Sequence, residues 1–217
     1  MTEYTLFCAP DTYAMSAHAI LEHVGADYAP HWVELFQAAP DPAFLAASPH
    51  CRTPALLGPD GPIFETGAVA LYVAEKHPDS GLSIPQGDPR RGVFLQWLHY
   101  LATTLQPDVI IQFHPEFYFA DTGDQARLKT ASMERLEGVF ATLESALENG
   151  PYFFGDTSTV PDFILATQTI WDVIFPDQDI TRYPNIARQR DAIYALPATQ
   201  RMVAQHAAER ERLQQKA

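Results

Sequence analysis

Two cysteines and eight histidines are the side chains of this chain that most readily act as nucleophiles or bind metals. Cys8 and Cys51 lie far apart and form no Cys-x-x-Cys pair, so their spacing predicts neither a disulfide framework nor a zinc site. No two histidines stand at the His-x-x-x-His spacing that places two ring nitrogens on one helix face. We therefore expect no metal ion, and a buried, inert thiol at Cys8.

Hydroxyl and carboxyl groups at two expected strand-to-helix junctions offer a different chemistry. Thr12 and Tyr13 follow a first short strand, and Glu65 and Thr66 precede a later helix. The first turn of a helix exposes backbone N–H groups that can bind an anion. A threonine at such a junction can also simply cap the helix. The residues alone leave both interpretations open.

The elements that position these groups follow from apolar periodicity and turn residues. The first part of the chain predicts a β-α-β unit, a short helical segment, a β-hairpin and a helix. This order is typical of a thioredoxin-like α/β domain, which we expect over residues 1–78. The expected elements are a strand at 5–8, a helix at 13–24, a strand at 28–34, a helical segment at 41–47, a hairpin at 53–57 and 63–65 about a turn at 58–62, and a helix at 66–76.

Residues 79–88 are rich in Pro, Gly, Ser and Asp and are expected to form a linker. Beyond them the strand signals disappear, so residues 89–217 predict an all-α helical-bundle C-terminal domain. The expected helices are 90–112, 125–147, 161–175, 184–194 and 198 onward.

Composition restricts the partners. The 217 residues are 47% hydrophobic, carry a formal net charge of −13, and include no run of 18 uninterrupted apolar residues. The negative charge disfavours nucleic acid and anionic membrane as partners, and no transmembrane helix or signal peptide is expected. With no disulfide framework expected, a cytoplasmic location is the default.

Three segments, in this order and spacing, resemble landmarks of glutathione S-transferases. The first matches the pattern Asn-Pro-x-Gly-Lys-Val-Pro-x-Leu, the second Glu-Ser-x-Ala-Ile-x-x-Tyr, and the third a late helical landmark. The loop after the first strand resembles that of the bacterial beta class, except that Tyr13 stands at the beta-class cysteine. The segments are Ser48–Leu56, Phe64–Tyr72, and Tyr183–Ile186 followed by Leu196–Ala198.

The resemblance implies a glutathione-binding site in the first domain. Pro54 would follow a cis peptide bond, leaving the Thr53 backbone to pair with the extended tripeptide. Glu65 would bind the γ-glutamyl ammonium group, and the helix start at Thr66 would bind its carboxylate. Arg52 would meet the glycyl carboxylate.

The resemblance also implies that the protein lowers the pKa of the bound glutathione thiol, so that the thiolate attacks an electrophile. A hydroxyl at the start of the first helix would do this, with Thr12 ahead of Tyr13 and Ser16 third. Thr12 can instead cap the helix, and Tyr13 can line the pocket. The loop departs from the beta class here, which puts that class's mixed-disulfide chemistry in doubt.

The helical domain is expected to build the pocket for a small hydrophobic electrophile. Thr159 and Asp162 resemble a capping box of the family, and we assign them to folding. The pocket residues implied by the resemblance are His99, His114, Tyr118 and Trp171.

The leading hypothesis is a homodimeric glutathione S-transferase acting in detoxification, with glutathione as co-substrate. The alternative is a non-catalytic protein of the same fold that holds glutathione or another ligand. A thioredoxin-like redox protein is disfavoured, because no Cys-x-x-Cys follows the first strand.

Overall fold

The computed structural model describes residues 2–215, and the chain divides into two compact units. One unit runs to Ser83 and takes up the chain again from Tyr194, and the other is Ile84–Ile193. No helix of the described residues is both long and apolar enough to cross a bilayer. The domain limits 1–78 and 89–217 expected from the sequence stay a prediction.

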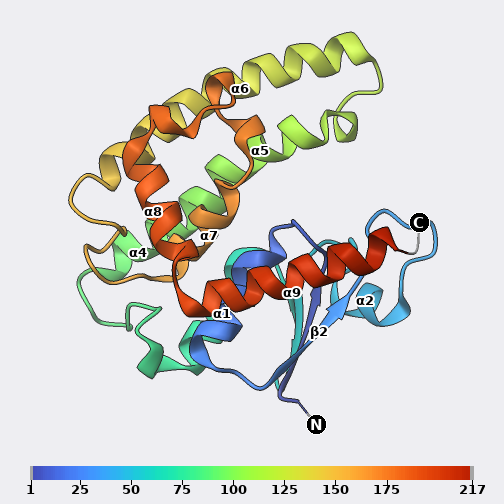
Figure 1. Ribbon diagram of the computed structural model, residues 1–217, viewed down its shortest axis with the longest axis vertical. Coiled ribbons are helices and arrows are strands. Elements are labelled where there is room, and N and C mark those ends of the chain that lie inside the picture. The colour runs from blue at the N-terminus through green and yellow to red at the C-terminus, as the bar shows by residue number, and fades with distance from the viewer. Residues whose placement is uncertain (1, 216–217) are drawn as a thin grey trace. The chain divides into compact units, whose positions relative to one another are not determined.

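The first unit contains a four-stranded sheet in the order β2-β1-β3-β4, and its edge strand β2 is labelled in Figure 1. β1 pairs with β2 in parallel, and β1 with β3 and β3 with β4 antiparallel. This confirms the thioredoxin-like arrangement. Its elements are β1 Tyr4–Cys8, α1 Ala14–Val24, β2 Tyr28–Trp32, α2 Pro42–Ala47, β3 Ala55–Gly58, β4 Gly61–Phe64, α3 Thr66–Lys76 and α9 Pro197–Gln214.

Alternate side chains of β1 are buried on the two faces of the sheet. Phe7 stacks on Phe44 of α2, with ring centroids 5.8 Å apart. Tyr4 points to the other face and makes an edge-on contact with Tyr72 of α3 at 6.5 Å. The strand is therefore apolar almost throughout, as a strand buried on both faces must be.

The hairpin turn is tighter than expected. Gly58 pairs with Gly61, so only Pro59 and Asp60 lie between the two strands, whereas the sequence predicted a turn over 58–62. Gly61 has a φ of 100°, a conformation that glycine adopts without steric cost. The position of the turn was predicted correctly, but the pairing of β3 with β4 includes Gly58 and Gly61, which were expected to lie in the turn.

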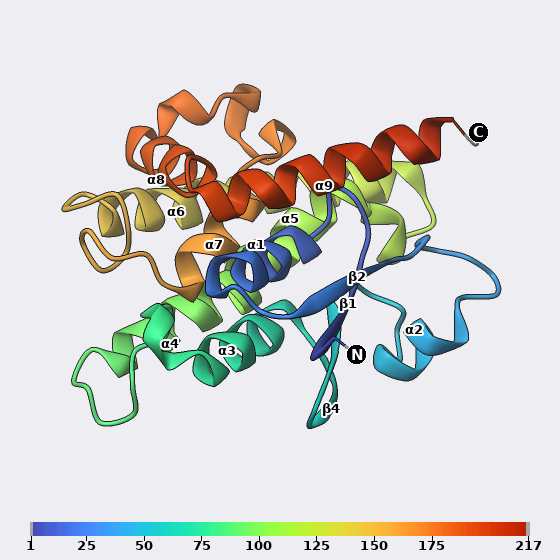
Figure 2. The ribbon, with the colours of Figure 1, turned by 60° about the horizontal axis from the view of Figure 1, so that its bottom comes forward.

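The last helix, α9, packs against α1 of the first unit, as Figure 2 shows. Arg201 near its start bonds to Glu22 near the end of α1, and Arg210 near its end bonds to Asp11 just before α1. The two helices are therefore antiparallel. From the sequence, residues 198 onward were expected to belong to the helical domain. Periodicity shows that a helix has a buried face, but it does not show which element that face packs against.

The second unit is helical, as expected. The expected helix 90–112 is interrupted by a π-helical segment, Leu101–Leu105. Pro107 lacks the N–H that would donate to residue 103, and the helix adjusts its turns just before it. The expected helix 161–175 was too long, since it ends at Gln168 and short 3₁₀ turns follow. The helices are α4 Arg91–Tyr100, α5 Gln106–Phe113, α6 Thr122–Ala146, α7 Val160–Gln168 and α8 Pro184–Tyr194.

The capping box expected at the start of α7 is present. The fully buried Asp162 carboxylate accepts hydrogen bonds from the Phe153 N–H at 3.0 Å, the Thr159 N–H at 2.7 Å and the Thr159 hydroxyl at 2.8 Å. Burial raises the pKa of Asp162 to about 6, although these donors act in the opposite direction. The box thus joins the preceding loop to the helix start.

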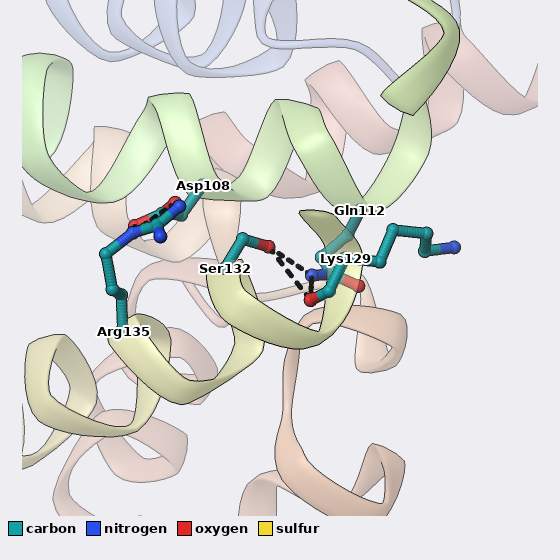
Figure 3. Close-up of polar contacts among 5 residues, drawn as sticks. All are labelled: Asp108, Gln112, Lys129, Ser132 and Arg135. Atoms are coloured by element: carbon teal, nitrogen blue, oxygen red, sulfur yellow. Dashed lines mark hydrogen bonds and ion pairs between the residues drawn. The ribbon is translucent and has the colours of Figure 1, made fainter. Parts of the chain in front are cut away.

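Polar contacts also join α5 to α6, as Figure 3 shows. The Arg135 guanidinium donates to both carboxylate oxygens of Asp108, with Nε 3.1 Å from each. One turn further along, the Gln112 amide donates to the Ser132 hydroxyl and, at 2.9 Å, to the Lys129 carbonyl. The Asp108 side chain is 10% exposed and that of Arg135 is 53% exposed.

This asymmetry predicts unequal effects of removing the two partners. Arg135→Met is expected to lower the free energy of unfolding by about 2 kcal/mol, because the Asp108 carboxylate stays buried without its donor. Asp108→Asn should cost less, about 1 kcal/mol, since Arg135 can be hydrated. Urea unfolding at pH 7 measures both, and equal losses would contradict the asymmetry.

Candidate glutathione site

The candidate site begins where two segments distant in sequence meet. The Thr53–Pro54 peptide bond is cis, as the resemblance implied. The Thr53 hydroxyl donates to the Thr12 hydroxyl oxygen at 3.2 Å, which joins the start of β3 to the start of α1. The Thr53 backbone N–H makes no hydrogen bond to any other group within residues 2–215. A backbone donor therefore lies beside Thr12, available to an extended ligand.

Thr12 is bonded within its own loop. Its hydroxyl donates to the Ala9 carbonyl at 2.8 Å and accepts from the Ala14 N–H at 3.4 Å. A threonine has one hydroxyl proton, and Ala9 receives it in this arrangement. To donate to a bound anion, the hydroxyl must rotate away from Ala9. The Thr12 hydroxyl is thus held by backbone groups of its own loop, one residue before the N-cap position of α1.

Tyr13 occupies the N-cap position of α1, and its phenol oxygen is buried. The helix that begins beside it directs the positive end of its dipole at this loop, which favours an anion there. Ser16, the third hydroxyl considered, is fully buried and donates to the Tyr13 carbonyl at 2.9 Å. The Thr12 hydroxyl contacts the second segment of the site through Thr53.

The two cysteines differ in their surroundings. Cys8 is fully buried, and burial raises the pKa of its thiol above the ordinary range. A thiol without access to solvent and with a raised pKa is not a nucleophile, as expected. Cys51 is half-buried and has a φ of 48°, at the place where the resembled pattern has glycine.

Glu65 and Thr66 lie at the junction of β4 and α3. The helix begins at Thr66, so Glu65 stands at the N-cap position, and Thr66 does not take the capping role that the sequence left open for it. Glu65 is exposed and has a φ of 76°, which costs a non-glycine residue about 1–3 kcal/mol. Such strain is found mainly at binding sites. Thr66 itself is buried at the helix start.

Arg52 lies beside a cavity of about 230 Å³. Its guanidinium group stands 5.0 Å from the ring centroid of Phe36. The sequence interpretation missed Phe36 and Glu34, because the loop after β2 carries no motif and only folding brings it to residues 49–52. The cavity is lined by Glu34, Phe36, Gln37, Pro40, Pro49, His50, Cys51 and Arg52.

The residues expected to form an electrophile pocket are only partly assembled within the second unit. Trp171 makes an edge-on contact with Phe113 at 5.4 Å. His114 stacks on Phe117 at 4.7 Å, and Tyr118, next along the chain, is 50% exposed.

The fourth expected pocket residue, His99, is exposed on α4. Within residues 2–215 no hydrogen bond, ion pair or ring contact joins its side chain to Trp171, His114 or Tyr118. The same residues contain no cluster of three or more His, Cys, Asp or Glu side chains that could hold a metal ion.

Known proteins share this sequence and fold. The models of the N-terminal and C-terminal domains of glutathione S-transferase match residues 2–75 and 107–205. The uncharacterized GST-like protein YncG of Escherichia coli K12 is 31% identical over 160 residues, which are 72% of this chain and 74% of YncG. Glutathione S-transferase GstA of E. coli O157:H7 is 28% identical over 76% of this chain and 81% of its own length.

A solved structure extends the match to nearly the whole chain. A sphingomonad glutathione S-transferase complexed with glutathione superposes with a TM-score of 0.80 at 25% identity, covering 94% of this chain and 98% of the other. The resemblance inferred from three short segments is thereby confirmed. The chain belongs to the glutathione S-transferase family.

Proposed function

We propose that this protein binds glutathione at Thr53, Glu65 and Thr66 and activates its thiol beside Thr12 for attack on a small hydrophobic electrophile. The observation that carries the proposal is the hydrogen bond between the Thr53 and Thr12 hydroxyls. It places the expected tripeptide-binding backbone next to a hydroxyl at the start of a helix. Arg52, which lines the cavity described above, is proposed to bind the glycyl carboxylate of glutathione.

The chemistry requires preferential stabilisation of the thiolate. A free thiol has a pKa near 8.5, so only a few per cent is ionised at pH 7. Lowering this pKa by about two units takes about 2.7 kcal/mol of preferential stabilisation. The Thr12 hydroxyl and the dipole of α1 are proposed to supply it. The thiolate then forms a carbon–sulfur bond as the leaving group departs with its electron pair.

The electrophile is proposed to bind near Trp171, His114, Tyr118 and His99. The aromatic character of this segment suits an apolar substrate, and Phe113, Phe117, Tyr118 and Phe119 are all more than 40% exposed. We further propose that the protein is a cytoplasmic homodimer with a role in detoxification.

Variants at the first helix test the proposal. In Thr12→Val, the pKa of the bound glutathione thiol should rise by about one to two units, because an isosteric side chain without a hydroxyl cannot donate to the thiolate. Thr12→Ser, which keeps the hydroxyl, should retain the low pKa of the wild type, and Tyr13→Phe should also leave that pKa unchanged. Thiolate absorbance in the ultraviolet, recorded across pH with glutathione bound, measures the pKa, and calorimetry measures binding.

Each result discriminates between assignments. A raised pKa in Tyr13→Phe and not in Thr12→Val would move the catalytic role to Tyr13. If the wild-type protein binds glutathione but the pKa of the bound thiol equals that of free glutathione, the transferase proposal is overturned.

That last outcome would support the second candidate, a non-catalytic glutathione-binding protein. One observation favours it: the Thr12 hydroxyl proton is already donated to Ala9. Turnover of an activated aryl halide by the wild-type protein separates the two candidates directly.

A further inference from the structure

The end of α9 contacts the loop that carries Thr12. Arg210 Nη1 donates to the Asp11 carboxylate, and Asp11 immediately precedes Thr12. Asp11 has a φ of 56°, a left-handed conformation that aspartate tolerates better than most residues. The two side chains are each 43% exposed, so the pair lies at the surface of the first unit. The ion pair thus acts on the backbone directly before the proposed catalytic hydroxyl.

Other contacts determine that Arg210 reaches this loop. At the opposite end of α9, Arg201 Nε donates to the Glu22 carboxylate at 2.6 Å. In the middle, His206 meets His18 of α1 at 3.0 Å. These contacts fix the antiparallel alignment of the two helices, which Figures 1 and 2 both show. Arg210, one turn after His206, is thereby placed at the start of α1.

A second ion pair at this end of α9 lies within the helix itself. Arg212 pairs with Glu209 on its own helix. Glu209 is almost fully buried, and Arg212 also lies within electrostatic reach of Glu34. Asp11 is the carboxylate adjacent to Thr12 in sequence, and Arg210 of α9 is its ion-pair partner.

We propose that Arg210 is a positioning residue for thiol activation, which neutralises the Asp11 carboxylate and holds the loop so that no unpaired negative charge stands beside the thiolate. This inference rests on the proposed function. A carboxylate next to a forming thiolate disfavours ionisation of the thiol, whereas a carboxylate that is paired with an arginine does so much less. The helix dipole of α1 can then act on the thiolate unopposed. The C-terminal helix becomes part of the site although it carries none of the family's glutathione-binding motifs.

The two partners are expected to have effects of opposite sign. Arg210→Gln leaves Asp11 unpaired and should raise the pKa of bound glutathione by about half a unit. Asp11→Asn removes the anion and leaves the cation, so it should lower that pKa by a similar amount. The double variant should return close to wild type. Because the pair is exposed, the shifts should shrink in high salt.

The experiment uses the full chain with glutathione bound, and reads thiolate absorbance and the pH profile of kcat/KM. Arg127→Gln, at a well exposed arginine of α6, controls for the loss of one positive charge from the chain. Arg201→Gln controls for weaker docking of the helix, since it removes the ion pair between α1 and the other end of α9. Both controls should leave the thiol pKa unchanged, and circular dichroism checks that every variant is folded.

Opposite shifts in Arg210→Gln and Asp11→Asn, with neither control moving, would establish the role of Arg210. If the wild-type protein lowers the pKa of the bound glutathione thiol and Arg210→Gln does not raise it again, the role of Arg210 is overturned but the proposed function is not. Equal shifts in Arg210→Gln and Arg201→Gln would also overturn it, because helix docking would then be the cause. A wild-type protein whose bound glutathione titrates as free thiol would overturn both this inference and the proposed function.

Discussion

Replacing Asp162 by alanine is expected to lower the free energy of unfolding by about 3–5 kcal/mol, the largest single effect that the structure predicts. The carboxylate is fully buried and receives three hydrogen bonds, from the Phe153 N–H, the Thr159 N–H and the Thr159 hydroxyl. Alanine leaves all three donors without this acceptor, two of them in buried hydrogen bonds, and each buried unsatisfied group costs about 1–3 kcal/mol before the structure relaxes. Urea unfolding at pH 7 measures the loss.

An exposed N-cap provides the matched control. Asp121 caps α6 by accepting from the Gly123 and Asp124 N–H groups at 2.9 and 3.0 Å, but it is exposed to solvent. Asp121→Ala should cost only about 1 kcal/mol, because water can replace the lost acceptor. If Asp162→Ala cost no more than Asp121→Ala, burial would not be the cause.

The pH dependence gives a second measure of the same site. The pKa of Asp162 is raised to about 6 in the folded protein, against 3.8 for an unperturbed aspartate. The folded state therefore binds this proton more tightly, and the contribution of Asp162 to stability rises as pH falls from about 7 to below 4. The gain relative to Asp162→Asn, which does not titrate, should be about 3 kcal/mol. A difference between wild type and this variant that stays constant with pH would contradict the raised pKa.

How far the sequence predicts this structure depends on the distance over which each feature is determined. The helix at 66–76 and the capping box at Thr159 and Asp162 were predicted correctly, because local spacing and side-chain chemistry determine both. The left-handed backbone of Glu65 was not predicted, since glutamate gives no local signal for a positive φ.

The candidate site divides in the same way. Thr12, Thr53 and Pro54 were identified because motifs of the family carry them. The partnership of Asp11 with Arg210 could not be predicted, because the two lie at opposite ends of the chain and meet only when α9 packs on α1. Charge and periodicity show that Arg210 lies on an amphipathic helix, but not which carboxylate it meets. Contacts of this kind require the fold.

The second large effect is a loss of stability in acid, caused by two buried histidines between α1 and α9. His18 and His206 are almost fully buried, and His18 Nδ1 lies 3.0 Å from His206 Nε2. The hydroxyl of Tyr28 donates to the Glu22 carboxylate at 2.5 Å, so its oxygen must accept from His18 Nε2 at 2.7 Å. His18 Nδ1 is then the acceptor, and His206 Nε2 is the donor between the two rings.

These tautomers leave no place for another proton. Protonating His18 at Nδ1 would set two N–H groups against each other. His206 Nδ1 has no hydrogen-bond partner within residues 2–215, so a proton there would lie buried and unsatisfied. Burial accordingly lowers the pKa of His18 to about 4 and that of His206 to about 3, and the nearby Arg210 charge lowers the latter further.

The sign of the pH effect follows from these lowered values. An unfolded histidine titrates near 6.5, so below that pH the unfolded state binds more protons than the folded state. The stability contributed by the two neutral histidines is therefore fully present above pH 6.5 and falls as the pH is lowered toward 4. The loss attributable to one histidine is about 3 kcal/mol at pH 4. The neighbouring Glu22 carboxylate opposes the shift of His18 but does not cancel it.

His206→Gln isolates this contribution, because the glutamine amide can still donate to His18 Nδ1 but cannot titrate. The free energy of unfolding of wild type and variant, measured by urea between pH 7.5 and 4.5, should diverge on acidification, with the variant losing less. Taking the difference between the two proteins removes the opposing contribution of Asp162. His50→Gln, at an exposed histidine, should follow wild type throughout. Parallel pH curves for His206→Gln and wild type would show that the histidine pair takes up its protons without unfolding, and the deduced tautomers would then be wrong.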